Sequence, residues 1–143
     1  MTFSLPDFTE NCLHSTVLGK AYLSSLPDEL IAEKIDAMVL SPRTERTVVD
    51  KRALMAEMKR IKRRGYALCD QEYLSGLISI GAPLFDPVGG KGLGAVSFDF
   101  SVLEHDAETI RAKYGKMIRE TARSLSGLMP PGEVRARWGS DGR

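Results

Sequence analysis

Three polar residues interrupt two neighbouring apolar stretches of the sequence. Ser79 lies within LISIGAPLF (residues 77–85), and Ser97 and Asp99 lie within LGAVSFDF (residues 93–100). Residues two apart on a strand point to the same face, so Ser97 and Asp99 would lie side by side. A binding pocket for a small polar ligand needs a few fixed groups of this kind among apolar walls. The pattern therefore predicts such a pocket, although hydroxyls that bond to neighbouring backbone would give the same sequence.

Glycines in the same region suggest two further roles. Gly76, Gly81 and Gly94 lack side chains, so we expect them to let another group approach the backbone. The run GGKGLG (residues 89–94) has the composition of a phosphate-binding loop. Such a loop needs Ser or Thr after the lysine and a helix behind it, whereas here glycine follows the lysine and a strand pattern comes next. We therefore predict a hairpin turn.

Catalytic and metal-binding patterns are weak. The residues that could ligate zinc are Cys12, His14, Cys69 and His105, from three distant segments in no ligand spacing. A lone cysteine is more often a small buried apolar group. Asp70 and Glu72 alternate on an extended segment and could form an acid pair, but a solvated turn is the commoner arrangement. Since no nucleophile has a base beside it in the sequence, we expect no enzyme activity, metal or cofactor.

The composition is that of one ordinary domain. The chain has 143 residues, of which 43% are hydrophobic, enough to close a core. Its 20 basic and 19 acidic residues nearly cancel, so no overall field attracts nucleic acid or a membrane. The basic residues between positions 51 and 64 surround an amphipathic helix, and we interpret them as a solvated face. With two cysteines, no leader pattern and no long apolar span, we expect a cytoplasmic protein.

Hydrophobic periodicity and capping residues predict the elements that must position these groups. We expect helices at residues 17–26, 29–38, 51–64 and 106–128, and strands at 66–69, 77–85 and 93–100. The expected start signals are Ser15 or Thr16, a capping box from Ser25 to Asp28, and Asp50. Three helices, an antiparallel three-strand meander and a final helix make an α+β fold rather than alternating βαβ units.

Steps of three and four residues predict which helix faces are buried. In the second helix the expected inward residues are Leu30, Ile31, Ile35 and Met38. In the last helix they are Ile110, Tyr114, Met117, Thr121 and Leu125. Residues 41–49, between the second and third helices, would form an extended linker.

Two stretches resemble a known family. They are LHSTVLGKAYLSSLPDE (residues 13–29) and the run from TERTVVDKRALMAEMK to GLGAVSFD (residues 44–99). His-Ser-Thr before a Gly-Lys-Ala helix, the frame GYA..DQE...GL.SI..P.FD and the strand GAVSF together resemble the effector-binding domain of the IclR family of bacterial transcription regulators. The DQE and GL.SI motifs further resemble those of the subgroup that controls aromatic-acid and β-ketoadipate catabolism.

The resemblance implies a GAF-like or profilin-like domain, an antiparallel sheet flanked by helices that holds a small organic acid or aromatic metabolite. It covers residues 13–128, which leaves a short lead-in (1–12) and a flexible tail (129–143). Family members carry a helix-turn-helix domain and the first strands of the sheet ahead of this segment. We therefore expect a domain truncated at its N-terminus that reaches DNA only through the missing domain. An unpaired sheet edge would favour a homodimer or tetramer.

The resemblance also implies ligand-binding positions. They are Val17, Leu18, Cys69, Asp70, Leu77, Ser79, Ser97 and Asp99. Val17 and Leu18 would supply backbone and wall contacts, and the two serines would donate hydrogen bonds. Asp99 occupies a place where many members have serine, and it would repel a ligand carboxylate unless it is protonated or points away. The alternative function is an oligomerisation or interaction module with no ligand competence.

Overall fold

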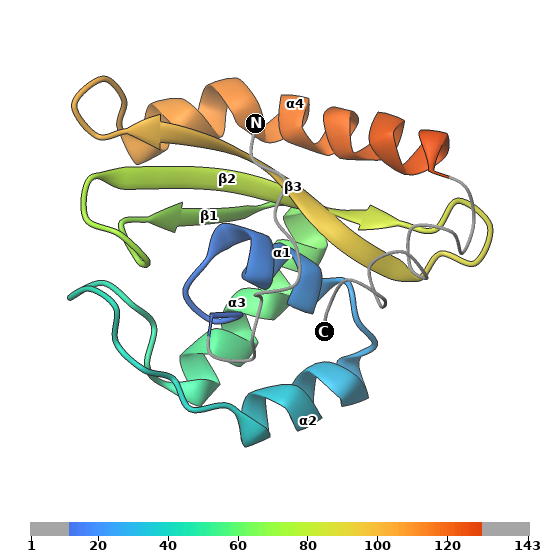
Figure 1. The fold of residues 1–143 in the computed structure, drawn as a ribbon, viewed down its shortest axis with the longest axis horizontal. Coiled ribbons are helices and arrows are strands. Elements are labelled where there is room, and N and C mark those ends of the chain that lie inside the picture. Colours follow the sequence, from blue (N-terminus) through green and yellow to red (C-terminus); the bar gives the residue numbers. More distant parts are fainter. Residues whose placement is uncertain (1–11, 130–143) are drawn as a thin grey trace, which may run out of the picture.

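The computed structural model describes residues 12–129, which form helices on both faces of a three-stranded antiparallel sheet (Figure 1). The helices are α1 (Val17–Ser24), α2 (Asp28–Ala37), α3 (Lys51–Arg64) and α4 (Ala107–Leu128). The strands are β1 (Ala67–Asp70), β2 (Leu77–Phe85) and β3 (Gly92–Ser101), in the order β1-β2-β3. The α+β prediction is confirmed. The predicted lead-in and tail lie almost wholly outside the described residues.

The sheet separates two hydrophobic clusters. Figure 1 shows α4 along one face and α1 and α3 on the other, with α2 farther from the sheet. On the α4 face, Ile80, Val96 and Ile118 are fully buried. On the α1 face, Cys69 and Ala95 pack among residues of α1, α2 and α3. Because strand side chains alternate, every second strand residue faces α1.

This alternation and the strand register bring the polar strand residues into one row. Cys69 of β1 pairs with Ser79 of β2, and Ser79 pairs with Asp99 of β3. Ser97 lies on the same face of β3, opposite Gly81. The sequence prediction that Ser97 and Asp99 share a face is therefore confirmed.

Helix α1 approaches the sheet closely at two glycines. A Cβ at Gly81 would lie 3.3 Å from Val17 Cγ2 and 3.1 Å from the Val96 carbonyl oxygen. The room at Gly81 is thus taken by α1 of the same chain, which corrects the expectation that it is left for another group. A Cβ at Gly19 would lie 2.6 Å from Leu13 Cα, since the turn before α1 folds back over the helix.

The helix boundaries confirm most start and stop signals. Thr16 caps α1 by accepting from the Gly19 amide, and Asp50 caps α3 by accepting from the Arg52 amide. Gly65 ends α3 in the left-handed conformation, at φ +84°. The predicted capping box at the second helix is wrong. Ser25 instead ends α1, where its hydroxyl donates to the Tyr22 carbonyl at 2.5 Å, and α2 begins after Pro27 with no side-chain cap.

Two predicted inward faces need correction. In α2, Leu30 is 36% exposed, whereas Ile31, Ile35 and Met38 are buried as predicted. In α4, Met117 is 47% exposed, and Ile118 and Ala122 are buried in its place. The buried residues of α4 are Ile110, Gly115, Ile118 and Ala122, so beyond Tyr114 the buried face lies one residue away from the predicted one.

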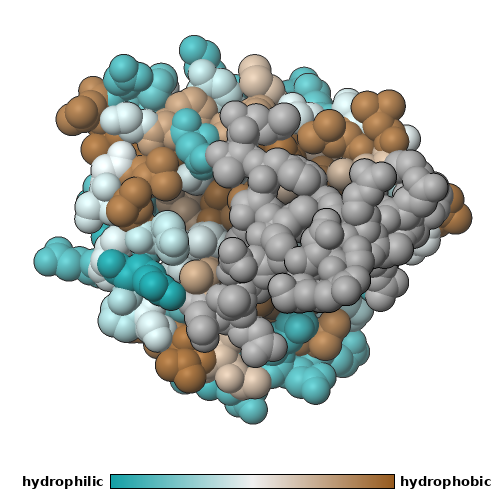
Figure 2. Space-filling view, in the orientation of Figure 1, coloured by the Kyte–Doolittle hydropathy of each residue, from teal (hydrophilic) through white to brown (hydrophobic). Residues whose placement is uncertain are grey.

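The remaining features concern the surface. Residues 86–91 turn between β2 and β3, with the Asp86 amide donating to the Lys91 carbonyl at 2.7 Å, which confirms the hairpin. Hydrophobic and hydrophilic residues are interspersed over the coloured part of the face in Figure 2. None of the helices in residues 12–129 has the length and apolar character needed to cross a membrane.

The close contact at Gly19 predicts a large cost for a small change. Gly19→Ala should lower the free energy of unfolding by about 1 to 3 kcal/mol, because the methyl group overlaps backbone atoms of the preceding turn. Gly127→Ala, in α4 with nothing within 4 Å of the added Cβ, is the matched control. It should be neutral or stabilise by up to about 1 kcal/mol, since alanine favours helix. Urea unfolding of both variants tests this; equal midpoints would contradict it.

Candidate functional site

A cavity of about 160 Å³ lies between the first turn of α1 and the row of polar strand residues. We call it the α1 cavity. Its lining consists of Ser15, Thr16, Val17, Leu18, Cys69, Glu72, Tyr73, Leu74, Leu77, Ser79, Ser97 and Asp99. Every ligand-binding position expected from the sequence is in this set except Asp70. A larger cavity of about 690 Å³ is lined by the end of α1, the C-terminal halves of α3 and α4, and the end of β2 with the turn after it, and it contains none of those positions.

The sheet wall of the α1 cavity is a cluster of hydrogen-bonded oxygens. The Ser79 hydroxyl donates to Asp99 Oδ1 at 2.7 Å, and the Ser97 hydroxyl lies 3.5 Å from the same oxygen. Both serines are nearly inaccessible, at 5% and 1% exposed, while Asp99 is exposed at the rim. The alternative that these hydroxyls bond to neighbouring backbone is therefore wrong; the partner that they share is the Asp99 side chain, opposite Ser79 and two residues beyond Ser97 on β3.

The opposite wall is the N-terminal turn of α1. The first amides of a helix have no partner within it. Thr16 satisfies the Gly19 amide and accepts from the Lys20 amide through its carbonyl, whereas the amides of Val17 and Leu18 form no hydrogen bond to any residue in 12–129. These amides and the helix dipole make this wall electropositive.

A buried lysine lies behind the cavity. Lys20 is fully buried, and its ammonium donates to Glu57 Oε1 of α3 at 2.7 Å and to Glu72 Oε1 of the segment after β1. Burial alone would lower the pKa of Lys20, but the negative groups around it, Cys69 when ionised, Glu57 and Glu72, raise that pKa above its ordinary value. Lys20 is therefore a permanent cation that joins three segments.

Glu72 is the member of this cluster that lines the cavity. Burial raises the pKa of its carboxyl above the ordinary value, although the charge and hydrogen bond of Lys20 act in the opposite direction. The cluster has two carboxyl groups and one ammonium, so a proton on one carboxylate would make the cluster electrically neutral. The Lys20 charge is fully matched within the fold.

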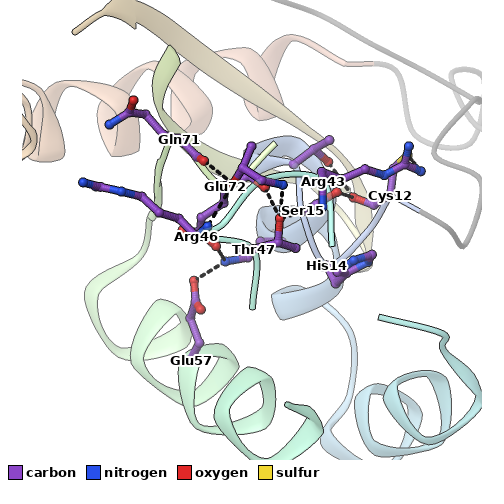
Figure 3. Close-up of polar contacts among 12 residues, drawn as sticks. Cys12, His14, Ser15, Arg43, Arg46, Thr47, Glu57, Gln71 and Glu72 are labelled. Carbon is purple, nitrogen blue, oxygen red and sulfur yellow. Dashed lines mark hydrogen bonds and ion pairs between the residues drawn. The ribbon is translucent and has the colours of Figure 1, made fainter. Parts of the chain in front are cut away.

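The segment that carries Glu72 is held by the loop before α3, as Figure 3 shows. Thr44 donates to the Gln71 carbonyl and Thr47 donates to the Glu72 carbonyl, each at 2.6 Å. Gln71 adopts φ +59°, an uncommon conformation for a residue with a side chain. The predicted linker at residues 41–49 is thus a structured clamp that fixes the backbone beside the cavity.

Two other candidate groups contribute little to the chemistry of the cavity: Asp70 lies outside it, and the Cys69 thiol is poorly reactive. Asp70 points away from it and pairs with Arg46 at 2.9 Å, so Asp70 and Glu72 do not form the acid pair considered above. Burial raises the pKa of the Cys69 thiol, with Lys20 acting in the opposite direction, which keeps it protonated and poorly nucleophilic.

The possible zinc ligands do not gather. His14 Nε2 bonds to the Ser41 carbonyl at 2.8 Å, and the His105 ring packs against Phe100. Among residues 12–129 no group of three His, Cys, Asp or Glu side chains is placed to hold a metal ion.

Sequence reasoning missed Lys20, Glu57 and Glu72. Two signals were present: Lys20 is the only charge in the helix VLGKAYLS, and Glu57 falls on the apolar stripe of α3 beside Leu54 and Met58. Charged residues at such positions are rarely buried unless paired, so each implied a partner. Tyr73 and Leu74, which line the cavity from a loop, left no periodic signal.

Comparison with known proteins identifies relatives. The family model described as "Bacterial transcriptional regulator IclR C-terminal" matches residues 9–127. The HTH-type transcriptional regulator BhcR of Paracoccus denitrificans is 32% identical over 126 residues, which are 88% of this chain and 44% of that protein. The chain thus spans less than half the length of this relative.

Solved structures show the same fold. The crystal structure of IclR from Thermotoga maritima matches with a TM-score of 0.74 at 30% identity, over 80% of this chain and 46% of that one. The inducer-binding domain of the Acinetobacter transcription factor PobR, a double mutant in complex with 3-hydroxybenzoic acid, matches with a TM-score of 0.74 at 24% identity. That match covers 82% of this chain and 66% of the PobR chain, and at this identity it shows the fold alone.

The Lys20 cluster predicts a severe effect of removing its cation. Lys20→Met leaves Glu57 and Glu72 together without a counter-charge, and should lower the free energy of unfolding by about 3 to 5 kcal/mol. Adding Glu57→Gln should recover part of the loss, because one negative charge is then removed. Lys116→Met, at a site with 81% exposure, is the control and should change little. Equal free energies of unfolding for Lys20→Met and Lys116→Met in chemical denaturation would contradict a stabilising role of the Lys20 cluster.

The raised pKa of Glu72 sets the direction of a pH dependence. The unfolded chain loses this proton near the ordinary pKa of 4.5, and the folded protein keeps it to higher pH. Between the two pKa values the folded state binds more protons, so this group makes stability fall as pH rises above 4.5. The glutamine of Glu72→Gln cannot ionise. As pH rises through this interval, the unfolding free energy of the variant should therefore increase relative to that of the wild type. Paired denaturation curves in acid and neutral buffers test this; a pH-independent difference would refute it.

Proposed function

The chain belongs to the IclR family of bacterial transcriptional regulators, as its C-terminal domain, and we propose that it senses a small organic acid bound in the α1 cavity. The observation that carries the proposal is the convergence, around one cavity, of apolar walls, a cluster of hydrogen-bonded oxygens and two helix amides that form no hydrogen bond within residues 12–129. A cavity with a few convergent polar groups is the form that small-molecule sites take.

The size of the α1 cavity limits the effector. Its volume is about 160 Å³. An apolar cavity of about 150 Å³ in a protein core holds one benzene molecule, whereas drug-sized ligands occupy pockets of about 300 to 1,000 Å³. The effector is therefore a single ring or a short chain. An aromatic acid satisfies this limit, in agreement with the subgroup that the sequence resembles.

The electrostatics of the two walls orient such an acid. Helix N-termini bind anions because their amides point at the ligand and the dipole favours negative charge. A carboxylate would therefore lie at the Val17 and Leu18 amides. On the opposite wall the carboxylate would meet the Asp99 carboxyl group, which already accepts from the Ser79 hydroxyl. The body of the acid would lie against Leu77 and the Tyr73–Leu74 loop.

The role of the domain in the whole protein follows from its relatives. BhcR is an HTH-type regulator more than twice as long as the matched region. The proposal is that this domain reports effector binding to a DNA-binding domain of that kind, and that it acts as a dimer or tetramer. PobR, which shares the fold, is a transcription factor whose inducer-binding domain holds a hydroxybenzoic acid.

The effector proposal predicts a ligand-induced stabilisation. Benzoate, hydroxybenzoates and short keto acids at a hundred times their dissociation constant should stabilise the fold by about 2.7 kcal/mol, measured as a rise in melting temperature. Ser79→Ala should weaken binding roughly two- to twelvefold, the effect of losing one hydrogen bond of about 0.5 to 1.5 kcal/mol. Ser126→Ala, the same change in the larger cavity, should leave binding intact.

Two outcomes would contradict this assignment. If Ser126→Ala rather than Ser79→Ala weakens binding, the ligand occupies the larger cavity. If no acid raises the melting temperature of the wild type, the domain is better explained as an assembly module, and β3, an edge strand within the described sheet, is the surface to examine by light scattering.

A further inference from the structure

The larger cavity lies where β2 extends beyond its neighbour β1. Strand β1 pairs with β2 only as far as Gly81, so residues 82–85 of β2 have a neighbouring strand on the β3 side alone. Helices α3 and α4 lie on opposite faces of the sheet (Figure 1), and their C-terminal halves line the cavity beside this uncovered edge. Its volume of about 690 Å³ is within the range of about 300 to 1,000 Å³ that larger small-molecule ligands occupy. The cavity can hold a molecule that the α1 cavity cannot.

The inner wall of the larger cavity is apolar. Ile61, Ala82 and Ala122 line it from three elements and are buried. Pro83 and Phe85 continue this wall along β2, and the Phe85 ring is 37% exposed, which is uncommon for a large apolar side chain at a strand end. A flat or aromatic group could cover this surface and remove it from water.

Positive charge gathers at the same cavity. Its described lining contains Lys62, Arg119 and Arg123 but a single acid, Asp86. The Lys62 ammonium is already paired, since it donates to Asp28 Oδ1 at 2.7 Å. Arg119 and Arg123 form no ion pair with any residue in the range 12–129. Two guanidinium groups are therefore available to an anion.

Gly65 positions one of these arginines. A Cβ at Gly65 would lie 2.7 Å from Arg119 Cδ, so the stem of Arg119 crosses the end of α3 in the space that the missing side chain leaves. Arg123 follows one turn later on the same face of α4. The nearby Arg64 is directed elsewhere, because its Nε donates to the Tyr66 carbonyl at 2.7 Å and its guanidinium lies over the Tyr66 ring.

Compensation of the helix dipole does not account for the two arginines. That effect is confined to the last turn of a helix. The last turn of α3 has its own basic residues, Lys62, Arg63 and Arg64, and the last turn of α4 contains none. Arg119 and Arg123 lie farther from the end of α4, beside the cavity rather than at a helix terminus.

We propose that the larger cavity is a second ligand site, which binds a phosphomonoester with an aromatic or apolar body. Guanidinium groups match phosphate oxygens with paired hydrogen bonds. A phosphomonoester carries a charge of about −1.5 to −2 at pH 7, which suits two arginines, whereas a carboxylate would match only one. The body of the ligand lies against Phe85 and the buried wall. The site goes beyond the proposed function, because its lining shares no residue with that of the α1 cavity.

The test compares esters with their parent compounds. Phenyl phosphate, phenol, AMP, adenosine and inorganic phosphate would be titrated into ¹⁵N-labelled protein, and binding followed by amide chemical shifts. The wild type should bind at least one ester ten times more tightly than both its parent compound and inorganic phosphate, a difference of about 1.4 kcal/mol. The shifts should be largest at Gly65 and Ser126, which line the cavity.

Matched variants separate charge at the cavity from charge in general. Arg119→Gln and Arg123→Gln should each weaken ester binding at least tenfold. Lys116→Gln removes the same charge from a side chain of α4 that is 81% exposed and outside the lining, and should leave binding unchanged. Phe85→Ser should weaken binding of the ester without changing that of inorganic phosphate. All four side chains are exposed, so the variants should fold, which circular dichroism checks.

Several results would overturn the second site. They are absence of binding by every probe, equal affinity for an ester and its parent, equal affinity for the esters and inorganic phosphate, and equal effects of Lys116→Gln and the arginine variants. Loss of ester binding in Ser79→Ala but not in Arg119→Gln would place the ester in the α1 cavity and overturn it as well. The proposed function is tested by acids and Ser79→Ala, so either site can fail while the other stands.

Discussion

The structure depends on the burial of one positive charge. An ammonium removed from water costs several kcal/mol unless it is paired and hydrogen-bonded, and Lys20 is fully buried. Its partners are Glu57 of α3 and Glu72 of the segment after β1. A change in the relative position of these three segments would leave a buried charge unmatched. The cluster thereby fixes where α1 lies over the sheet.

Placement of α1 creates the two walls of the cavity. Val17 packs at Gly81 of β2, where an added Cβ would lie only 3.3 Å from it, so the helix lies close to the strands. The first turn then faces the row formed by Cys69, Ser79 and Asp99. One wall supplies amides and the other supplies oxygens. This polarity, rather than the volume alone, is what would let the domain distinguish one small acid from another.

The cluster also connects the cavity to the helices behind it. Glu72 lines the cavity, and through Lys20 it reaches Glu57 on α3. Its backbone is held by Thr47 from the loop that precedes α3. A ligand that displaces Glu72 or changes its protonation would therefore act on α3 through hydrogen bonds of the fold. Glu72 thus links the wall of the cavity to α3 by hydrogen bonds within one face of the sheet.

The sequence by itself determined the local features of this protein. Two-residue alternation put Ser97 and Asp99 on one face, and Gly65 marked the end of α3. The motifs that resemble the family indicated binding positions at Val17, Leu18, Leu77 and Ser79, which line the α1 cavity. These features depend on short periods or on quoted motifs. The rotation of α4, which buries Ile118 instead of Met117, depends on the surface beneath it. The Lys20 partners lie 37 and 52 residues away, and the direction of the Ser79 hydroxyl depends on a strand pairing across 20 residues. Tertiary structure decided those contacts, because electrostatic pairing and desolvation act between groups that only the folded chain brings together.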